Sequence, residues 1–266
     1  MLWGHIPAAE YRKVIVGLIF LRYISSVFDK KYQELLAEGD GFEEDIDEYT
    51  SEGIFFVPAN ARWSVIASKA HTPEIGTVID EAMRAIEKEN KRLKDILPKN
   101  FARPELDKRR LGDVVDLFTN IKMVDAGSSR DILGRTYEYC LSKFAEQEGK
   151  LAGEFYTPSC VVRTLVEVLQ PYNGRVYDPA CGSGGMFVQT GDFVNHAGMS
   201  ANAAMTFYGQ EKVEYNAQLC LMNMAVHGLN GKILSGNEAN TFYNDAHSLE
   251  GCCDYVMANP PFNVDK

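Results

Sequence analysis

The first part of the chain carries a helical pattern of apolar positions. Residues 73–97 repeat with a period of three to four, with Pro73 near the start and Pro98 after the end, and residues 107–121 do so again. Residues 38–53 are acidic and contain glycine, which predicts a loop. The segment from Ala8 to Ala37 has the same helical pattern, with apolar residues at Val14, Leu18, Leu21, Val27, Phe28, Leu35 and Leu36.

The pattern changes near Asp125. After one more helical segment at residues 131–150, short apolar runs alternate with helical segments, and each run ends in polar residues or glycine. This alternation predicts an α/β fold with a parallel sheet and helices on its faces. We therefore predict a helical domain at 1–124 and an α/β domain at 125–266. The four strand candidates are "RVYDPA", "MTFYGQ", "GKILSG" and "CDYVMA".

Composition and charge narrow the possible functions. The chain is 45% hydrophobic and carries a net charge of −10, so it is not expected to bind DNA tightly and nonspecifically by itself. Its longest apolar run, Val14 to Leu21, is far shorter than the roughly 20 residues that span a bilayer. These features predict a soluble, cytoplasmic protein without a membrane segment. The six cysteines lack zinc spacing, so we expect reduced thiols and no metal site.

One stretch opposes the acidic charge. Residues 88–110 hold nine Lys or Arg against four acidic residues. The simplest interpretation is a solvated helix face and loop. The alternatives are a patch that faces nucleic acid or one that faces an acidic partner surface.

A glycine-rich motif follows the first strand candidate. In "DPACGSGGMF", which begins at Asp178, the glycines allow a sharp turn and close approach of a ligand. The next helix would point its free N–H groups at that ligand, in the crevice at the strand ends. The G-x-G-G spacing is neither a dinucleotide fingerprint nor a P-loop. Glu211 ends the second strand candidate, where an acid suits two ribose hydroxyls; the alternative is a solvent-facing glutamate.

The fourth strand candidate is followed by "NPPF". The oxygen of Asn259 and a nearby backbone carbonyl can accept both hydrogens of an exocyclic amine. Pro260 and Pro261 stiffen the loop and contribute no competing N–H donor. Phe262 can stack on a base that has left the duplex. A plain surface turn, the alternative, would rarely combine these three features directly after a buried strand.

These motifs together resemble a known family. The order of the glycine motif and NPPF, with "GEFYTP" at residues 153–158 before both, is similar to the N6-adenine methyltransferases of the gamma class. More specifically, the chain resembles the modification subunit of type I restriction–modification systems. The stretches "EYRKVIVGLIFLRYIS", "FFVPANARWS" and "LDKRRLGDVVDLF" resemble its helical N-terminal domain, and "ILGRTYEYCLSKFA" resembles its entry into the catalytic domain.

The resemblance implies a Rossmann-like methyltransferase sheet that binds S-adenosyl-L-methionine. It implies that Glu211 binds the ribose hydroxyls and that Asn240 lies near the cofactor adenine. Asn259 and Pro260 would bind the target amine, with Phe262 stacking on the base. The backbone and amino group of the cofactor would be held by Asp178, Gly182, Ser183 and Gly184. Its methionine end would be flanked by Glu154, Phe155, Tyr156, Thr157, Pro158 and Ser159.

The expected activity is methylation of adenine N6 in DNA, within a type I restriction–modification complex. The resemblance implies a specificity subunit, a second modification subunit and a restriction subunit as partners, with double-stranded DNA bound through the complex. Relatives continue past NPPF with further strands, so the sheet is expected to be incomplete at residue 266. Two alternatives remain: a free-standing adenine methyltransferase, and a non-catalytic scaffold that binds partners through its N-terminal helices.

Overall fold

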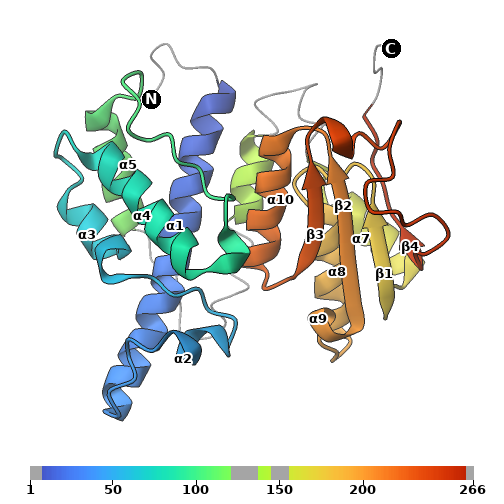
Figure 1. The fold of residues 1–266 in the computed structure, drawn as a ribbon, viewed down its shortest axis with the longest axis horizontal. Coiled ribbons are helices and arrows are strands. Elements are labelled where there is room, and N and C mark those ends of the chain that lie inside the picture. The colour runs from blue at the N-terminus through green and yellow to red at the C-terminus, as the bar shows by residue number, and fades with distance from the viewer. Residues whose placement is uncertain (1–7, 121–136, 145–155, 262–266) are drawn as a thin grey trace. The chain divides into compact units, whose positions relative to one another are not determined.

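The computed structural model describes residues 8–120, 137–144 and 156–261 (Figure 1). Its internal contacts divide the chain into two units, Met1–Tyr137 and Glu138–Lys266. The predicted boundary at 124/125 lies outside the described residues and stays a prediction. None of the helices formed by the described residues is long and apolar enough to cross a membrane.

The N-terminal unit is helical, as predicted. Its first helix, α1, spans Ala8–Glu38 and buries apolar side chains on almost all sides between Val16 and Leu21, which is typical of a helix inside a core. The remaining helices are α2 (Ile46–Thr50), α3 (Trp63–Ser68), α4 (Ile75–Glu89) and α5 (Lys108–Asn120), with short 3₁₀ turns η1 (Ala59–Ala61) and η2 (Lys91–Leu93).

Two sequence predictions in this unit are wrong in detail. The first concerns residues 38–53, predicted as a loop, which contain the helix α2. The Asp45 carboxylate caps this helix by accepting the N–H of Asp47 at 3.0 Å. Tyr49 of α2 is fully buried and stacks on Phe28 of α1, with 4.7 Å between ring centroids. The cap and the buried ring together stabilise a helix too short to form alone.

The second correction concerns the helix predicted at 73–97, because α4 ends at Glu89. Asn90 then leaves the helical conformation and is buried. Its side chain accepts the N–H of Phe56 at 3.0 Å and donates to the carbonyl of Phe56 at 2.9 Å. The amide thus bonds to both backbone groups of Phe56, 34 residues earlier in the chain. That tertiary contact stops the helix where the local sequence would have continued it.

Part of the basic stretch is used inside this unit. The ammonium group of Lys108 donates to the carbonyls of Phe101 at 2.8 Å and Arg103 at 2.6 Å. Lys99 forms an ion pair with Glu87, and the guanidinium of Arg92 lies 5.6 Å from the centre of the Phe55 ring. These three cations stabilise local structure, so the surface charge available to a partner is smaller than the sequence count suggests.

The second unit contains the predicted parallel sheet. Its strands are β1 (Gly174–Asp178), β2 (Met205–Glu211), β3 (Gly231–Ser235) and β4 (Tyr255–Val256), in the order β3-β2-β1-β4 (Figure 1). All three pairings are parallel. The chain builds outward from β1 to β3 and then returns to place β4 on the other side of β1. The strand order therefore reverses beside β1, which is where open α/β sheets bind ligands.

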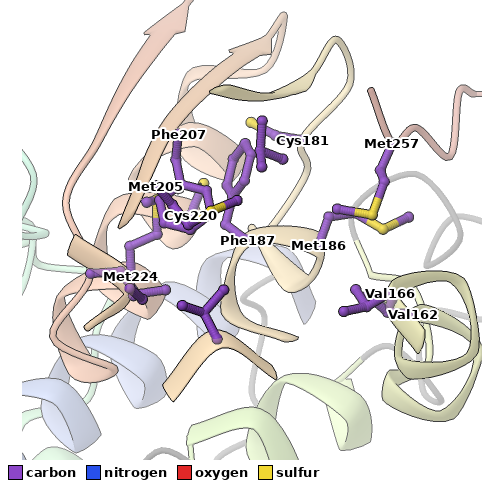
Figure 2. Packing of buried hydrophobic residues seen from close by; sticks show 14 residues of the cluster. Val162, Val166, Cys181, Met186, Phe187, Met205, Phe207, Cys220, Met224 and Met257 are labelled. Atoms are coloured by element: carbon purple, nitrogen blue, oxygen red, sulfur yellow. Dashed lines mark hydrogen bonds between the residues drawn. The ribbon is translucent and has the colours of Figure 1, made fainter. Parts of the chain in front are cut away.

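Helices pack on this sheet, and side chains from the helices and the strands together form the hydrophobic core of this unit. They are α7 (Ser159–Leu169), α8 (Gly185–His196), the short α9 (Ala201–Ala204) and α10 (Glu214–Val226). Residues 137–144 are helical, within the helix predicted at 131–150; the rest of that prediction lies outside the described residues. Phe187 of α8 and Phe207 of β2 lie side by side, with ring centroids 5.5 Å apart (Figure 2). This core holds the C-terminal ends of β1 and β2 in fixed positions.

Candidate functional site

The glycine turn lies between β1 and α8. Gly182 has φ +51° and Gly184 has φ +79°, both in the left-handed region that favours glycine. A Cβ atom on Gly184 would lie 2.7 Å from the sulfur of Cys220, so this position has no room for a side chain. The turn leads directly into α8, whose first N–H groups have no partner within the helix. The backbone therefore presents donors at the end of β1.

Asp178 is the last residue of β1 and is 1% exposed. Burial raises the pKa of its carboxyl to about 7, and the nearby charge of Glu211 acts in the same direction. The N–H of Ala180, which donates to the carboxylate at 3.0 Å, opposes the rise. An acid in this state can lose its proton near neutral pH when a positive charge is placed beside it.

Glu211 ends β2 and is buried, so the alternative of a solvent-facing glutamate is excluded. One carboxylate oxygen accepts the N–H of Gly182 at 3.0 Å, and the other accepts the N–H of Val213 at 2.8 Å. The side chain thus joins the end of β2 to the glycine turn. A carboxylate has about four acceptor positions, which suits a group that binds hydroxyl donors.

The NPPF loop follows β4, in which Tyr255 is half-buried and Val256 is exposed, so the prediction of a buried strand before NPPF is wrong for these two residues. The N–H of Met257 donates to the carbonyl of Tyr177 at 3.1 Å, which extends the pairing beyond β4. Asn259 comes two residues later, and its Nδ2 donates to the hydroxyl oxygen of Thr157 at 3.0 Å. The two residues are 102 positions apart in the chain. The hydrogen bond brings the NPPF loop against the "GEFYTP" segment, while Pro260 and Pro261 are exposed.

One small pocket is lined by residues from all three motifs. Thr157, Asp178 and Asn259 lie around it together with the backbone of the glycine turn. The other residues that line it are Tyr156, Ala180, Cys181, Gly182, Ser183, Gly185 and Met186. The three motifs, separated by up to about a hundred residues in the sequence, therefore meet at one place beside the strand-order reversal.

Comparison with known proteins decides the family. Residues 128–266 match the family model of the N-6 DNA methylases, and residues 1–118 match that of the HsdM N-terminal domain. The chain is 35% identical over 96% of its length to the MjaIX methylase subunit of a type I restriction enzyme from Methanocaldococcus jannaschii, of which it covers 48%. This chain belongs to the type I restriction enzyme methylase subunits.

Further similarities agree with this membership. The chain is 38% identical to the type I HindI methylase subunit of Haemophilus influenzae, over 78% of this chain and 50% of that protein. It thus spans about half the length of the curated relatives it matches. A type I methyltransferase subunit from Streptococcus thermophilus has the same fold, with a TM-score of 0.73 at 20% identity, covering 96% of this chain and 59% of that one.

The remaining predicted residues of this methylase-subunit chain lie at different distances from the pocket. Gly184 is in the turn but does not line the pocket, and Asn240 follows the 3₁₀ turn η4 (Asn237–Ala239) after β3. Pro158 caps α7 and Ser159 is its first residue. Ser159 lines an adjoining cavity. Glu154, Phe155 and Phe262 lie outside the described residues. The binding roles of all these residues stay predictions.

Two buried amides that support the site were missed in the sequence. Gln210, next to Glu211, donates to the carbonyl of Asn244 at 3.0 Å and accepts the hydroxyl of Tyr177 at 2.9 Å. It therefore anchors the segment that follows Asn240 against the strand ends. The sequence does offer a sign of this role: Gln210 lies inside the strand "MTFYGQE", and a polar residue in a buried strand requires hydrogen-bond partners.

The second missed amide is Asn223 of α10, which is 2% exposed. Its Nδ2 donates to the carbonyl of Ser183 at 3.0 Å, so α10 supports the glycine turn from behind. Asn223 also lines the adjoining cavity with Gln189 and Glu138, where burial raises the pKa of the Glu138 carboxyl. The signal in the sequence was an asparagine within the apolar helix "LCLMNMAV".

The residues around the pocket fit S-adenosyl-L-methionine. Gly182 lines the pocket and has no side chain, so its backbone is open to close approach. Asp178 lines the pocket and provides a carboxyl group for a cationic ligand, whereas Glu211 does not line it and presents its carboxylate at the end of the neighbouring strand, beside Gly182. Thr157 also lines the pocket.

Proposed function

We propose that this chain binds S-adenosyl-L-methionine and the target adenine in a modification subunit that methylates adenine N6 in DNA. The observation that carries the proposal is the shared pocket: the NPPF asparagine, Asn259, lines it together with Asp178 and the glycine turn. A methyl donor and an amine acceptor must meet within bonding distance, and the shared pocket brings the two motifs together. Membership in the methylase-subunit family agrees with this reading.

The cofactor-side residues would act by binding and orienting. S-adenosyl-L-methionine supplies an electrophilic methyl group on a sulfonium sulfur. Asp178 would hold the positively charged amino group, while the backbone of Gly182–Gly184 and the start of α8 would contact the rest of the methionine end. Glu211 would accept both ribose hydroxyls, and Asn240 would lie near the cofactor adenine. Tyr156 and Thr157 would close the methionine end.

The base-side residues would activate the acceptor nitrogen. The Oδ1 atom of Asn259 and the carbonyl of Pro260 would accept the two hydrogens of the N6 amine. Holding both hydrogens shifts the nitrogen from planar, conjugated character toward a nucleophile. A strong general base is then not needed, because the proton can leave after methyl transfer. Pro261 would stiffen the loop, and Phe262 would stack on the extruded base.

Both the net charge of this chain and the names of its relatives support a complex with other subunits. The relatives are named as subunits of type I restriction enzymes, which supports a specificity subunit, a second modification subunit and a restriction subunit as partners of this chain. A net charge of −10 disfavours independent DNA binding, and part of the basic stretch is used internally. We therefore expect double-stranded DNA to be bound through the complex, in the cytoplasm.

The proposal is tested with Asn259→Ala in the complete subunit assembled with its specificity subunit. Transfer of labelled methyl groups to adenine-containing duplex should be abolished, while calorimetry should show cofactor affinity within about threefold of the parent. Gly184→Asp is the comparison variant that should lose cofactor binding through the turn, and thermal unfolding checks that it folds. If Asn259→Ala retains activity within about threefold, the role assigned to Asn259 is wrong. A parent complex that binds cofactor but transfers no methyl would favour the non-catalytic scaffold.

A further inference from the structure

The segment between β3 and β4 carries Asn240 but has little apolar packing of its own. Within residues 239–246, which the structure describes in full, only Ala239 is buried, while Phe242 and Tyr243 are largely exposed. Burial of apolar side chains therefore contributes little to the position of this segment. Its place beside the strand ends depends on hydrogen bonds instead.

The side chain of Gln210 binds the backbone of this segment at both of its ends. Its Nε2 donates to the carbonyls of Ala239 at 3.2 Å and Asn244 at 3.0 Å, and its Oε1 accepts the N–H of Ala246 at 3.1 Å. A carbonyl only accepts and an N–H only donates, so these partners allow one orientation of the amide. Gln210 is 0% exposed, so water does not compete for these bonds.

Thr241 adds a further link that has a defined direction. Its hydroxyl donates to the carbonyl of Pro179 at 2.6 Å, and because a carbonyl only accepts, the hydroxyl hydrogen lies in that bond. The oxygen of Thr241 therefore accepts from Nε2 of Gln210, at 3.3 Å. Pro179 follows Asp178 in the glycine-rich motif, so this chain of bonds joins the segment to the start of the proposed cofactor site.

Gln210 is in turn held by the sheet. It lies in β2 directly before Glu211, and its backbone carbonyl accepts the N–H of Cys181 in the glycine turn at 3.1 Å. Its Oε1 also accepts the hydroxyl of Tyr177, from the neighbouring strand β1, at 2.9 Å. One buried residue thus contacts β1, the glycine turn and the segment that carries Asn240. A substitution at this position removes the side-chain contacts but leaves the backbone bond to the turn.

We propose that Gln210 is a positioning residue for cofactor selectivity: its amide holds residues 239–246 at the strand ends and so fixes Asn240 where it can read the adenine of the cofactor. The inference rests on the proposed function, in which Asn240 lies near that adenine, and it gives Gln210 a role that involves no contact with a ligand. Without the amide, the bond from Thr241 to Pro179 is the one link described above that remains, and Asn240 is no longer held at a fixed place beside the turn.

The test compares Gln210→Met with the parent in the complete subunit. Methionine keeps the length of the side chain and suits a buried position, but it has neither end of the amide. Titration calorimetry measures affinity for S-adenosylhomocysteine and for S-inosylhomocysteine, whose base carries an oxygen in place of the N6 amine. The parent should prefer the adenine ligand at least about tenfold. Gln210→Met should bind the adenine ligand at least about tenfold more weakly than the parent, with affinity for the inosine ligand within about threefold.

Two further variants separate positioning from a general loss of stability. Thr241→Val keeps the β-branch but removes the hydroxyl between Gln210 and Pro179, so the preference for the adenine ligand should fall at least about threefold. Asn90→Ala is the matched control, because Asn90 is also a buried amide bonded to backbone at both ends but belongs to the N-terminal unit. It should change neither affinity by more than about twofold. Thermal unfolding checks that each variant is folded at the titration temperature, and if Gln210→Met is not, Thr241→Val decides alone.

The outcomes separate this inference from the function on which it rests. A parent that binds neither ligand removes the proposed function and the inference with it. A parent that binds both ligands equally overturns the inference alone, because the segment would then not read the base. So does a Gln210→Met variant that keeps the parent preference, or one that loses affinity for both ligands equally and so supports the site only as a whole. A Thr241→Val variant with the parent preference, or an Asn90→Ala variant that loses it, would also contradict the inference.

Discussion

If Asp178 holds the amino group of the cofactor as proposed, its buried carboxyl should make cofactor binding depend on pH. In the free chain its pKa is raised to about 7, chiefly by burial, from an ordinary value of 3.8. A cationic ligand beside it favours the ionised form. Below pH 7 binding must therefore expel a proton from Asp178, and above pH 7 it need not.

The expected magnitude follows from the pKa. Apparent affinity for S-adenosyl-L-methionine should fall by about tenfold for each pH unit below the pKa, so that binding at pH 6 is about tenfold weaker than at pH 8. The variant Asp178→Asn keeps an oxygen that can accept the N–H of Ala180 but cannot ionise. We expect its affinity to be weak and nearly independent of pH over this range.

Titration calorimetry between pH 5.5 and 8.5, in two buffers of different ionisation enthalpy, measures both the affinity and the proton released. Asp113→Asn, which changes an exposed carboxyl of α5, is the matched control and should follow the parent. A parent affinity that is flat across this range would refute the reasoning. So would an Asp178→Asn variant with the same slope as the parent, because another group would then be responsible.

The raised pKa of Asp178 should also make the free energy of unfolding depend on pH. Because the folded-state pKa lies above the ordinary value, the contribution of Asp178 to stability is fully present below about pH 4 and is lost as pH rises through about 7. The gap corresponds to at most about 4 kcal/mol. Relative to the parent, Asp178→Asn should therefore gain stability between pH 4 and pH 8 in denaturant titrations. An unchanged difference between the two proteins across that range would contradict the raised pKa.

Three further substitutions test the surrounding structure. Gly184→Ala should lower the free energy of unfolding by about 1–3 kcal/mol. Gly198→Ala should lower it less, because Gly198 has a similarly positive φ but open space for a Cβ. Equal losses in thermal unfolding would exclude the clash with Cys220. Gln210→Leu should cost about 2–4 kcal/mol and speed proteolysis within 239–246; unchanged cleavage would remove the anchor. Asn90→Ala should cost about 2–3 kcal/mol in denaturant unfolding, and a loss below about 0.5 kcal/mol would show that its bonds to Phe56 do not end α4.

The sequence by itself predicted the features that depend on neighbouring residues. The four strands, their parallel arrangement and the helices α1 and α5 follow from the spacing of apolar positions, which reports the period of each element directly. The glycine turn was also predictable, because the chemistry that permits its backbone conformation is within Gly182 and Gly184 themselves. Asn259 was identified as a candidate because the diproline that isolates its oxygen is adjacent to it.

Tertiary structure decided what depends on partners far away in the chain. Helix α4 ends at Glu89 because Asn90 bonds to Phe56, 34 residues earlier, and no local period contains that information. The hydrogen bond from Asn259 to Thr157 spans 102 residues, so only the path of the chain around β1 brings the two together. The raised pKa of Asp178 likewise depends on burial by surrounding elements and on Glu211 of the next strand. A residue's type is local, but its dielectric surroundings and its hydrogen-bond partners are properties of the folded packing.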